Sequence, residues 1–158
     1  MSLTTPMTCN GWLYRGEEFD PSAHDMNKLH GFVYLIENLE NGMKYIGKKG
    51  FTFSKTRQVK KKKRRYKVES DWREYHGSSE DLHRDLEVYG PEAFRRTILH
   101  LCRSKGEATY LEAREQFVRD VLLRDDYYNN WISCRVRGPH IKLLREDYQG
   151  EAPLDSGV

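Results

Sequence analysis

The stretch FVYLIENLENGMKYIGKKG, residues 32–50, decides the fold of this chain. Two short runs of β-branched and aromatic residues flank Asn41-Gly42, a dipeptide that strongly favours a tight hairpin turn. The pattern therefore predicts two antiparallel strands, at residues 31–37 and 43–48. Each run carries one tyrosine, and lysines crowd the second run. The hairpin is therefore either an ordinary element with basic side chains or half of an active site.

Further elements follow the hairpin. Residues 94–102 form an apolar run typical of a third strand, and residues 105–124 have the apolar periodicity of a long helix. Ser78, with Asp81 three residues later, predicts the cap of a shorter helix, and residues 70–76 predict a short helix or turn. We expect an α+β fold with a small three-stranded antiparallel sheet flanked by helices.

The chain divides by composition into three parts. Residues 1–29 lack periodicity and predict an irregular N-terminal arm. Residues 30–135 predict one domain, with a basic insertion at 49–67 that we expect to be a loop, because six consecutive cations cannot pack into a core. Residues 136–158 predict a tail that is basic at first and disordered at its end.

Charge is unevenly distributed along the 158 residues, whose net charge is +3. From Lys44 to His76 there are 13 Lys/Arg and 3 Asp/Glu, whereas the rest of the chain holds 14 and 21. A cationic third on an acidic body indicates a polyanionic partner, with nucleic acid the leading candidate. The residues expected to contact DNA are Lys48, Lys49, Lys60, Lys61, Lys62, Lys63, Arg64 and Arg65.

Composition bounds the other possibilities. No apolar stretch approaches the ~18 residues that a membrane span needs, so no membrane partner is expected. The first residues do not have the pattern of a signal peptide. The cysteines Cys9, Cys102 and Cys134 are odd in number and scattered, as expected in a reducing compartment. We therefore expect an intracellular protein of the cytoplasm or nucleoid.

A glutamate interrupts the apolar stripe of the long predicted helix. The stripe runs through positions 108, 111, 115, 118 and 122 and is apolar except at Glu115. A carboxylate on a core-facing stripe is unfavourable by several kcal/mol unless it is paired or binds a metal. Glu115 is therefore either half of a buried ion pair or a site residue at the edge of the core. Glu112 lies one helical step to the side and is the second candidate.

Several catalytic patterns are absent. The sequence has no Asp-x-Lys or Glu-x-Lys, no paired histidines at zinc spacing, no serine-hydrolase elbow and no phosphate-binding glycine loop. What remains is tyrosines, cations and a conspicuous glutamate, and these groups can hydrolyse a phosphodiester. Nearby cations favour a phenolate, so we expect a lowered tyrosine pKa and a tyrosine general base.

The residues Phe32-Val33-Tyr34 and Tyr45-Ile46-Gly47, with eleven residues from tyrosine to tyrosine, resemble the two signature triplets of the GIY-YIG nuclease family. The second triplet matches fully, and the first has Phe32 where the family prefers glycine. The order of elements downstream also matches, so the resemblance covers roughly residues 31–131. It implies a metal-dependent DNA endonuclease that uses Mg²⁺ or Mn²⁺.

The resemblance assigns roles by position. Tyr34 is implied as the general base, and Tyr45 as the residue that orients water or phosphate. The family's metal-binding glutamate falls on Glu115, and its late asparagine on Asn129, which would support the glutamate or metal. The family's catalytic arginine is less easily placed, because the basic insertion interrupts the alignment. We assign it to Arg73, in the short helix expected after the insertion, with His76 as its polar partner. Alternative cations are Lys49, Arg64 and Arg65.

Within the family, a compact chain most resembles homing endonucleases of phages or mobile elements, which would place it in a host cell; restriction and repair nucleases are alternatives. A second hypothesis is a non-catalytic nucleic-acid-binding module on the same fold. A third is a basic structural protein of a virion or ribonucleoprotein. The sequence sets no oligomeric state.

Overall fold

The computed structural model describes residues 11–149. Its helices are α1 (Glu80–Tyr89), α2 (Lys105–Val118) and α3 (Lys142–Asp147), with short 3-10 turns at Pro21–Ala23, Met26–Lys28, Pro91–Ala93 and Gly138–Ile141. Its strands are β1 (Leu13–Tyr14), β2 (Glu17–Glu18), β3 (Gly31–Asn38), β4 (Lys44–Gly50), β5 (Thr52–Val59), β6 (Lys62–Glu69) and β7 (Phe94–Cys102). Among these residues no helix combines the length and apolar character needed to cross a membrane.

The central sheet has five strands in the order β2-β1-β7-β3-β4. The expected antiparallel core of β4, β3 and β7 is present, and β3 lies at its centre with nearly every residue buried. The expectation of three strands was wrong because residues 13–18 add two more, with β1 parallel to β7. Part of the expected N-terminal arm therefore belongs to the sheet, and Trp12 and Phe19 are buried in its core.

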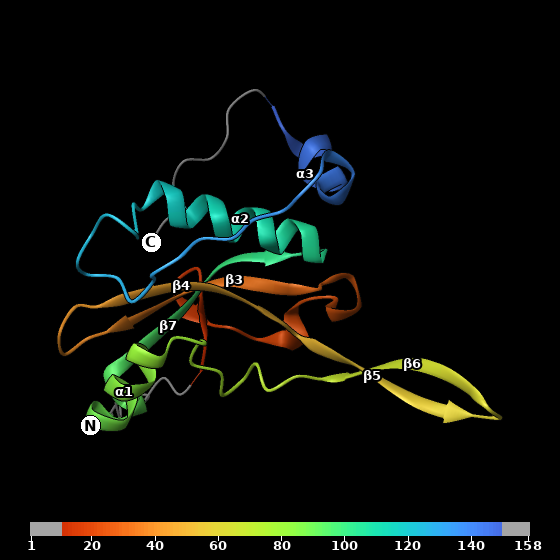
Figure 1. The fold of residues 1–158 in the computed structure, drawn as a ribbon, viewed down its shortest axis with the longest axis horizontal. Coiled ribbons are helices and arrows are strands. Elements are labelled where there is room, and N and C mark those ends of the chain that lie inside the picture. Colours follow the sequence, from red (N-terminus) through yellow and green to blue (C-terminus); the bar gives the residue numbers. More distant parts are fainter. Residues whose placement is uncertain (1–10, 150–158) are drawn as a thin grey trace.

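Alternation along β3 produces two cores, one on each face of the sheet. Phe32, Tyr34 and Ile36 point to the face covered by the N-terminal segment and α1. Val33 and Leu35 point to the opposite face, which α2 covers (Figure 1). The strand β4 lies at the edge of the sheet, so side chains from both layers meet around it.

The basic insertion is a two-stranded ribbon and not the expected loop. Strands β5 and β6 pair antiparallel over their full length and project away from the central sheet (Figure 1). All their side chains are exposed except those of Val59 and Val68, which are half-buried. The six consecutive cations are indeed kept out of the core. They can nevertheless form strands, because both faces of the ribbon are exposed to solvent.

Residues 71–74 form a turn, one of the two forms expected for residues 70–76. The helix α2 was expected to reach residue 124 but ends at Val118, and Val118 and Leu122 are exposed while Val121 is buried. Trp72 is buried, whereas Trp131 has 71% of its surface exposed. The tail contains the helix α3, and its expected disorder, like Cys9, lies outside the described residues.

Candidate active site

A cavity of about 680 Å³ opens beside the edge strand β4. Its walls come from β3, β4, the segment that begins α1, the helix α2 and the segment 128–135. Both signature tyrosines line it, together with Lys48, Glu112 and Asn129. Segments up to a hundred residues apart in sequence therefore place a phenol pair, a cation and a carboxylate around one space.

Two glycines make room for the tyrosines. A side chain at Gly47 would collide with the hydroxyl and ring of Tyr34, so the absence of a side chain there lets Tyr34 reach across β4. Gly77 has φ +82° and lies against both tyrosines. The rings of Tyr34 and Tyr45 lie 6.2 Å apart, and the hydroxyl of Tyr45 is 3.1 Å from that of Ser78.

Ser78 was expected to cap α1, but the structure gives that role to Ser79, whose hydroxyl accepts from the amide of Leu82. The shift by one residue leaves the Ser78 hydroxyl beside Tyr45 at the cavity.

Both tyrosines have a raised pKa. Burial raises the pKa of Tyr34 well above its ordinary value, and Tyr75, Tyr45 and Glu112 add to the effect. Burial also raises the pKa of Tyr45, although its hydrogen bond with Ser78 opposes this. The expectation that nearby cations lower the tyrosine pKa was wrong for the protein alone, because desolvation of the phenolate is the largest effect on the pKa of each tyrosine.

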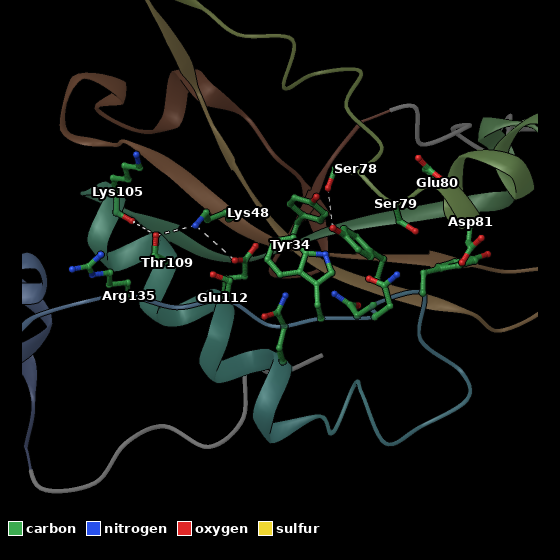
Figure 2. A pocket seen from close by; sticks show the side chains of 17 residues that line it. Tyr34, Lys48, Ser78, Ser79, Glu80, Asp81, Lys105, Thr109, Glu112 and Arg135 are labelled. Carbon is green, nitrogen blue, oxygen red and sulfur yellow. Dashed lines mark hydrogen bonds and ion pairs between the residues drawn. The ribbon is translucent and has the colours of Figure 1, made fainter.

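Three acidic residues line the cavity: Glu80 and Asp81 at the start of α1, and Glu112 on α2, which lies beside Lys48. The Oε1 of Glu112 lies 3.7 Å from Nζ of Lys48, and Lys48 donates a 2.9 Å hydrogen bond to Thr109 Oγ1 (Figure 2). Burial raises the pKa of Glu112 even though Lys48 opposes this. The side chain of Lys48 thus extends from the edge strand β4 to α2, and Lys48 lines the cavity.

Glu115, which the stripe and the resemblance had favoured, does not line the cavity. Its Oε1 is 2.7 Å from Nε2 of His100 on β7, and its Oε2 is 3.0 Å from Nε of Arg119. Although burial raises the pKa of Glu115, the hydrogen bonds from His100 and Arg119 outweigh this and hold the pKa below its ordinary value. Of the two alternatives left open by periodicity, the structure favours the buried ion pair.

Asn129 lines the cavity and forms hydrogen bonds with the edge strand β4. The Ile46 amide donates to Asn129 Oδ1 at 3.0 Å, and Asn129 Nδ2 donates to the Ile46 carbonyl at 2.8 Å. This amide side chain therefore bonds to β4 as a neighbouring strand would. It fixes the strand that carries Tyr45 and Gly47.

Gln116 is a cavity residue that sequence reasoning missed. Its Nε2 donates to the Ile46 carbonyl at 3.2 Å, while its Oε1 is the one buried side-chain oxygen or nitrogen without a partner across residues 11–149. Gln116 follows Glu112 by four positions, so both side chains lie on one face of α2. That spacing was the available signal, but it became informative only once Glu112 was known to face the cavity.

The structure does not bring Arg73 or His76 to the cavity. Arg73 pairs with Glu69 at 2.8 Å and stacks on the Trp72 ring, and His76 Nδ1 lies 2.7 Å from the carbonyl oxygen of Glu74. Burial, followed by the charge of Arg96, lowers the pKa of His76.

The alternative cations are also elsewhere. Lys49 points to the other face of β4, where it pairs with Asp71 at 2.6 Å and lies 4.0 Å from the centre of the Tyr75 ring. Arg64 and Arg65, like the lysines 60–63, belong to the ribbon. The cations that line the cavity are Lys48, Lys105 and Arg135.

A divalent ion would find a small set of oxygen ligands here. Residues 11–149 contain no cluster of three or more His, Cys, Asp or Glu side chains suited to a metal. Mg²⁺, however, often takes one or two carboxylates and completes its shell with water and substrate phosphate. The Glu112 carboxylate fits that pattern, whereas the unpartnered Gln116 oxygen is buried and would have to turn toward the cavity to join it.

A tyrosine pair, a cation and a carboxylate lie together beside the edge strand of an α+β domain, in agreement with the resemblance to the GIY-YIG family. The family model described as "Putative endonuclease segE, GIY-YIG domain" matches residues 12–132, and the chain belongs to this family. The match begins at Trp12, in agreement with the added strands β1 and β2. No curated protein and no solved structure matches the chain significantly. GIY-YIG nucleases depend on divalent metals, and a nuclease domain implies a DNA substrate.

Proposed function

We propose that this protein is a metal-dependent DNA endonuclease that hydrolyses a phosphodiester in the cavity beside β4. The observation that carries the proposal is that Tyr34, Tyr45, Lys48 and Glu112 line one cavity in a chain of the GIY-YIG family. Three cations line the cavity, Lys48, Lys105 and Arg135, together with three carboxylates, Glu80, Asp81 and Glu112, so it offers partners both for a phosphate and for a divalent cation.

Tyr34, Tyr45 and Lys48 have different roles in the proposed hydrolysis. Tyr34 takes a proton from the attacking water as the water oxygen bonds to phosphorus and the bond to the sugar oxygen breaks. Tyr45, held by Ser78, orients the water or phosphate. Lys48 stabilises the negative charge that develops on the phosphate.

Glu112, with Gln116 beside it, is the proposed ligand of Mg²⁺ or Mn²⁺. A bound divalent ion supplies positive charge that favours anionic oxygens, including a Tyr34 phenolate that burial alone disfavours. Asn129 acts by holding the edge strand in place.

The biological setting is also a proposal. A compact nuclease domain with an added basic ribbon suits a homing endonuclease of a phage or mobile element, acting on DNA in the cytoplasm or nucleoid. Restriction and repair nucleases are the alternatives. Cleavage of a long duplex at one preferred site would favour homing or restriction, whereas cleavage that depends on a branch or lesion would favour repair.

Plasmid nicking with Mg²⁺ or Mn²⁺ tests the proposal. Tyr34→Phe and Glu112→Gln should each reduce the nicking rate at least about 100-fold, the scale of a lost general base or electrostatic group. Tyr110→Phe removes a hydroxyl from an exposed residue of the same helix that carries Glu112 and serves as the control. DNA binding without any wild-type cleavage of duplex, branched or single-stranded DNA would favour the non-catalytic binding module.

A further inference from the structure

The ribbon of β5 and β6 has a shape that matches a DNA groove. Its register runs without interruption from Thr52 opposite Glu69 to Val59 opposite Lys62. Eight residues in each strand give a length of about 27 Å. The major groove of B-DNA, about 12 Å wide, admits a two-stranded ribbon of this kind.

The ribbon carries an unusual density of uncompensated charge. Nine Lys/Arg lie between Lys55 and Lys67, and none of them forms an ion pair with any residue from 11 to 149. By contrast, Lys44, Lys48 and Lys49, just before the ribbon, all have acidic partners. A projecting element with so many free cations has little to stabilise it within its own chain and is complementary to a polyanion.

The two faces of the ribbon differ in chemistry. Because side chains alternate along a strand, directly paired residues share a face. One face pairs a small or amide side chain on β5 with a cation on β6 three times in succession: Ser54 with Lys67, Thr56 with Arg65 and Gln58 with Lys63. The opposite face mixes cations with bulky side chains, and there the Arg57 guanidinium lies 5.4 Å from the centre of the Tyr66 ring.

The tip of the ribbon has two lysines in a backbone conformation that lysine rarely adopts. Lys60 and Lys61 form its two-residue turn with φ of 48° and 61°. Positive φ at both positions is the geometry for which Asn-Gly is preferred, and side chains other than glycine are strained there. A turn chosen for stability alone would not place two lysines at these positions.

We propose that the ribbon enters the major groove of duplex DNA with its Thr56–Arg65 face toward the base edges. This inference rests on the proposed endonuclease function and adds the element that would select the target. Arginine and lysine bind guanine edges, glutamine binds adenine, and serine or threonine accepts either, so this face carries groups suited to direct readout. Cations of the opposite face and tip reach the flanking phosphates, which fixes the position of the ribbon without reading sequence.

The fold also sets the distance between recognition and cleavage. Strand β4 continues into β5, so Gly47, which lies against Tyr34, and Thr52 at the base of the ribbon are at most about 18 Å apart. The ribbon extends about 27 Å further. At about 3.4 Å per base pair, the contacted bases should lie within about 13 base pairs of the cut phosphate.

Two neighbouring arginines provide a matched test. Arg64 and Arg65 carry the same charge on the same strand but point to opposite faces. Binding is measured by fluorescence anisotropy on the full chain with Glu112→Gln, which prevents cleavage, and duplexes are selected from a library with a randomised tract of about 20 base pairs. Arg65→Ala should weaken binding to the selected duplex about 5- to 150-fold and relax its preference at one or two positions. Arg64→Ala should weaken binding to selected and random duplexes equally, and lower the salt slope by about 0.9.

Three results would overturn the inference. The first is that Arg64→Ala and Arg65→Ala weaken binding equally and leave the base preference unchanged. The others are that the Glu112→Gln protein enriches no sequence from the library, or that it binds single-stranded DNA as tightly as duplex. Any of them would leave the ribbon as a sequence-independent phosphate contact. Nicking by the wild-type protein is scored separately, so a failure of base readout is distinguishable from a failure of the endonuclease proposal.

Discussion

The two neighbouring glutamates of α2 should respond in opposite ways to loss of charge. Glu115→Gln breaks a largely buried cluster in which Glu115 forms an ion pair with Arg119 and a hydrogen bond with His100; 10%, 16% and 22% of the Glu115, Arg119 and His100 side chains are exposed. Breaking a fully buried pair costs about 3–5 kcal/mol, so partial exposure suggests about 3 kcal/mol of lost unfolding free energy. In a domain of this size that is a fall of about 6–12 °C in Tm.

Glu112→Gln should leave stability nearly unchanged. The ion pair with Lys48 is longer, at 3.7 Å, and Lys48 keeps its hydrogen bond to Thr109. Burial raises the pKa of Glu112, which shows that the charged form is disfavoured where it lies. We therefore expect a change below about 1 kcal/mol, together with loss of plasmid nicking.

Thermal unfolding followed by circular dichroism and plasmid nicking below the Tm of both variants measure the two effects. The expected pattern is a stable, inactive Glu112→Gln and a destabilised Glu115→Gln that still cuts. An active Glu112→Gln beside a stable, inactive Glu115→Gln would refute the assignment and restore the glutamate that the helix stripe first indicated.

Three further predictions concern other parts of the molecule. Gly47→Ala should displace the Tyr34 hydroxyl, reduce unfolding free energy by about 1–3 kcal/mol and reduce nicking in the same assay, because the added methyl has no room. Lys60→Asn with Lys61→Gly should preserve or raise Tm, since the new turn suits positive φ, yet lower the salt slope of duplex binding by about 1.8. The folded-state pKa of Glu115 is lowered, so its contribution is present above its ordinary pKa of 4.5 and is lost as pH falls through the lowered value. The difference in urea midpoint between wild type and Glu115→Gln should therefore shrink toward zero in acid.

Sequence signals predicted an element well where the residues that carry the signal are the residues that form the element. The Asn41-Gly42 turn and its flanking alternation produced β3 and β4, and the apolar run at 94–102 produced β7. The missed strands β1 and β2 are two residues each, too short for any periodicity, and they exist only because β7 offers an edge. The ribbon was missed because its strands have no buried face, which removes the hydrophobic alternation that marks a strand.

The candidate site divides in the same way. Tyr34, Tyr45 and Asn129 were selected from sequence, and the structure places them at one cavity. Arg73 and His76 were selected by an alignment across the basic insertion, and neither of them lines the cavity.

The sequence by itself determined the hairpin, the long helix, the segregated positive charge and the pair of signature tyrosines. Each of these depends on residues close together in the chain, where turn chemistry and side-chain period act directly. Only the tertiary structure decided which glutamate serves the cavity. Glu112 and Glu115 are three residues apart and so differ by only about 60° around the helix. The rotation of α2 against the sheet therefore turns one toward Lys48 and the other toward His100. That rotation is set by packing between distant segments, and no local pattern records it.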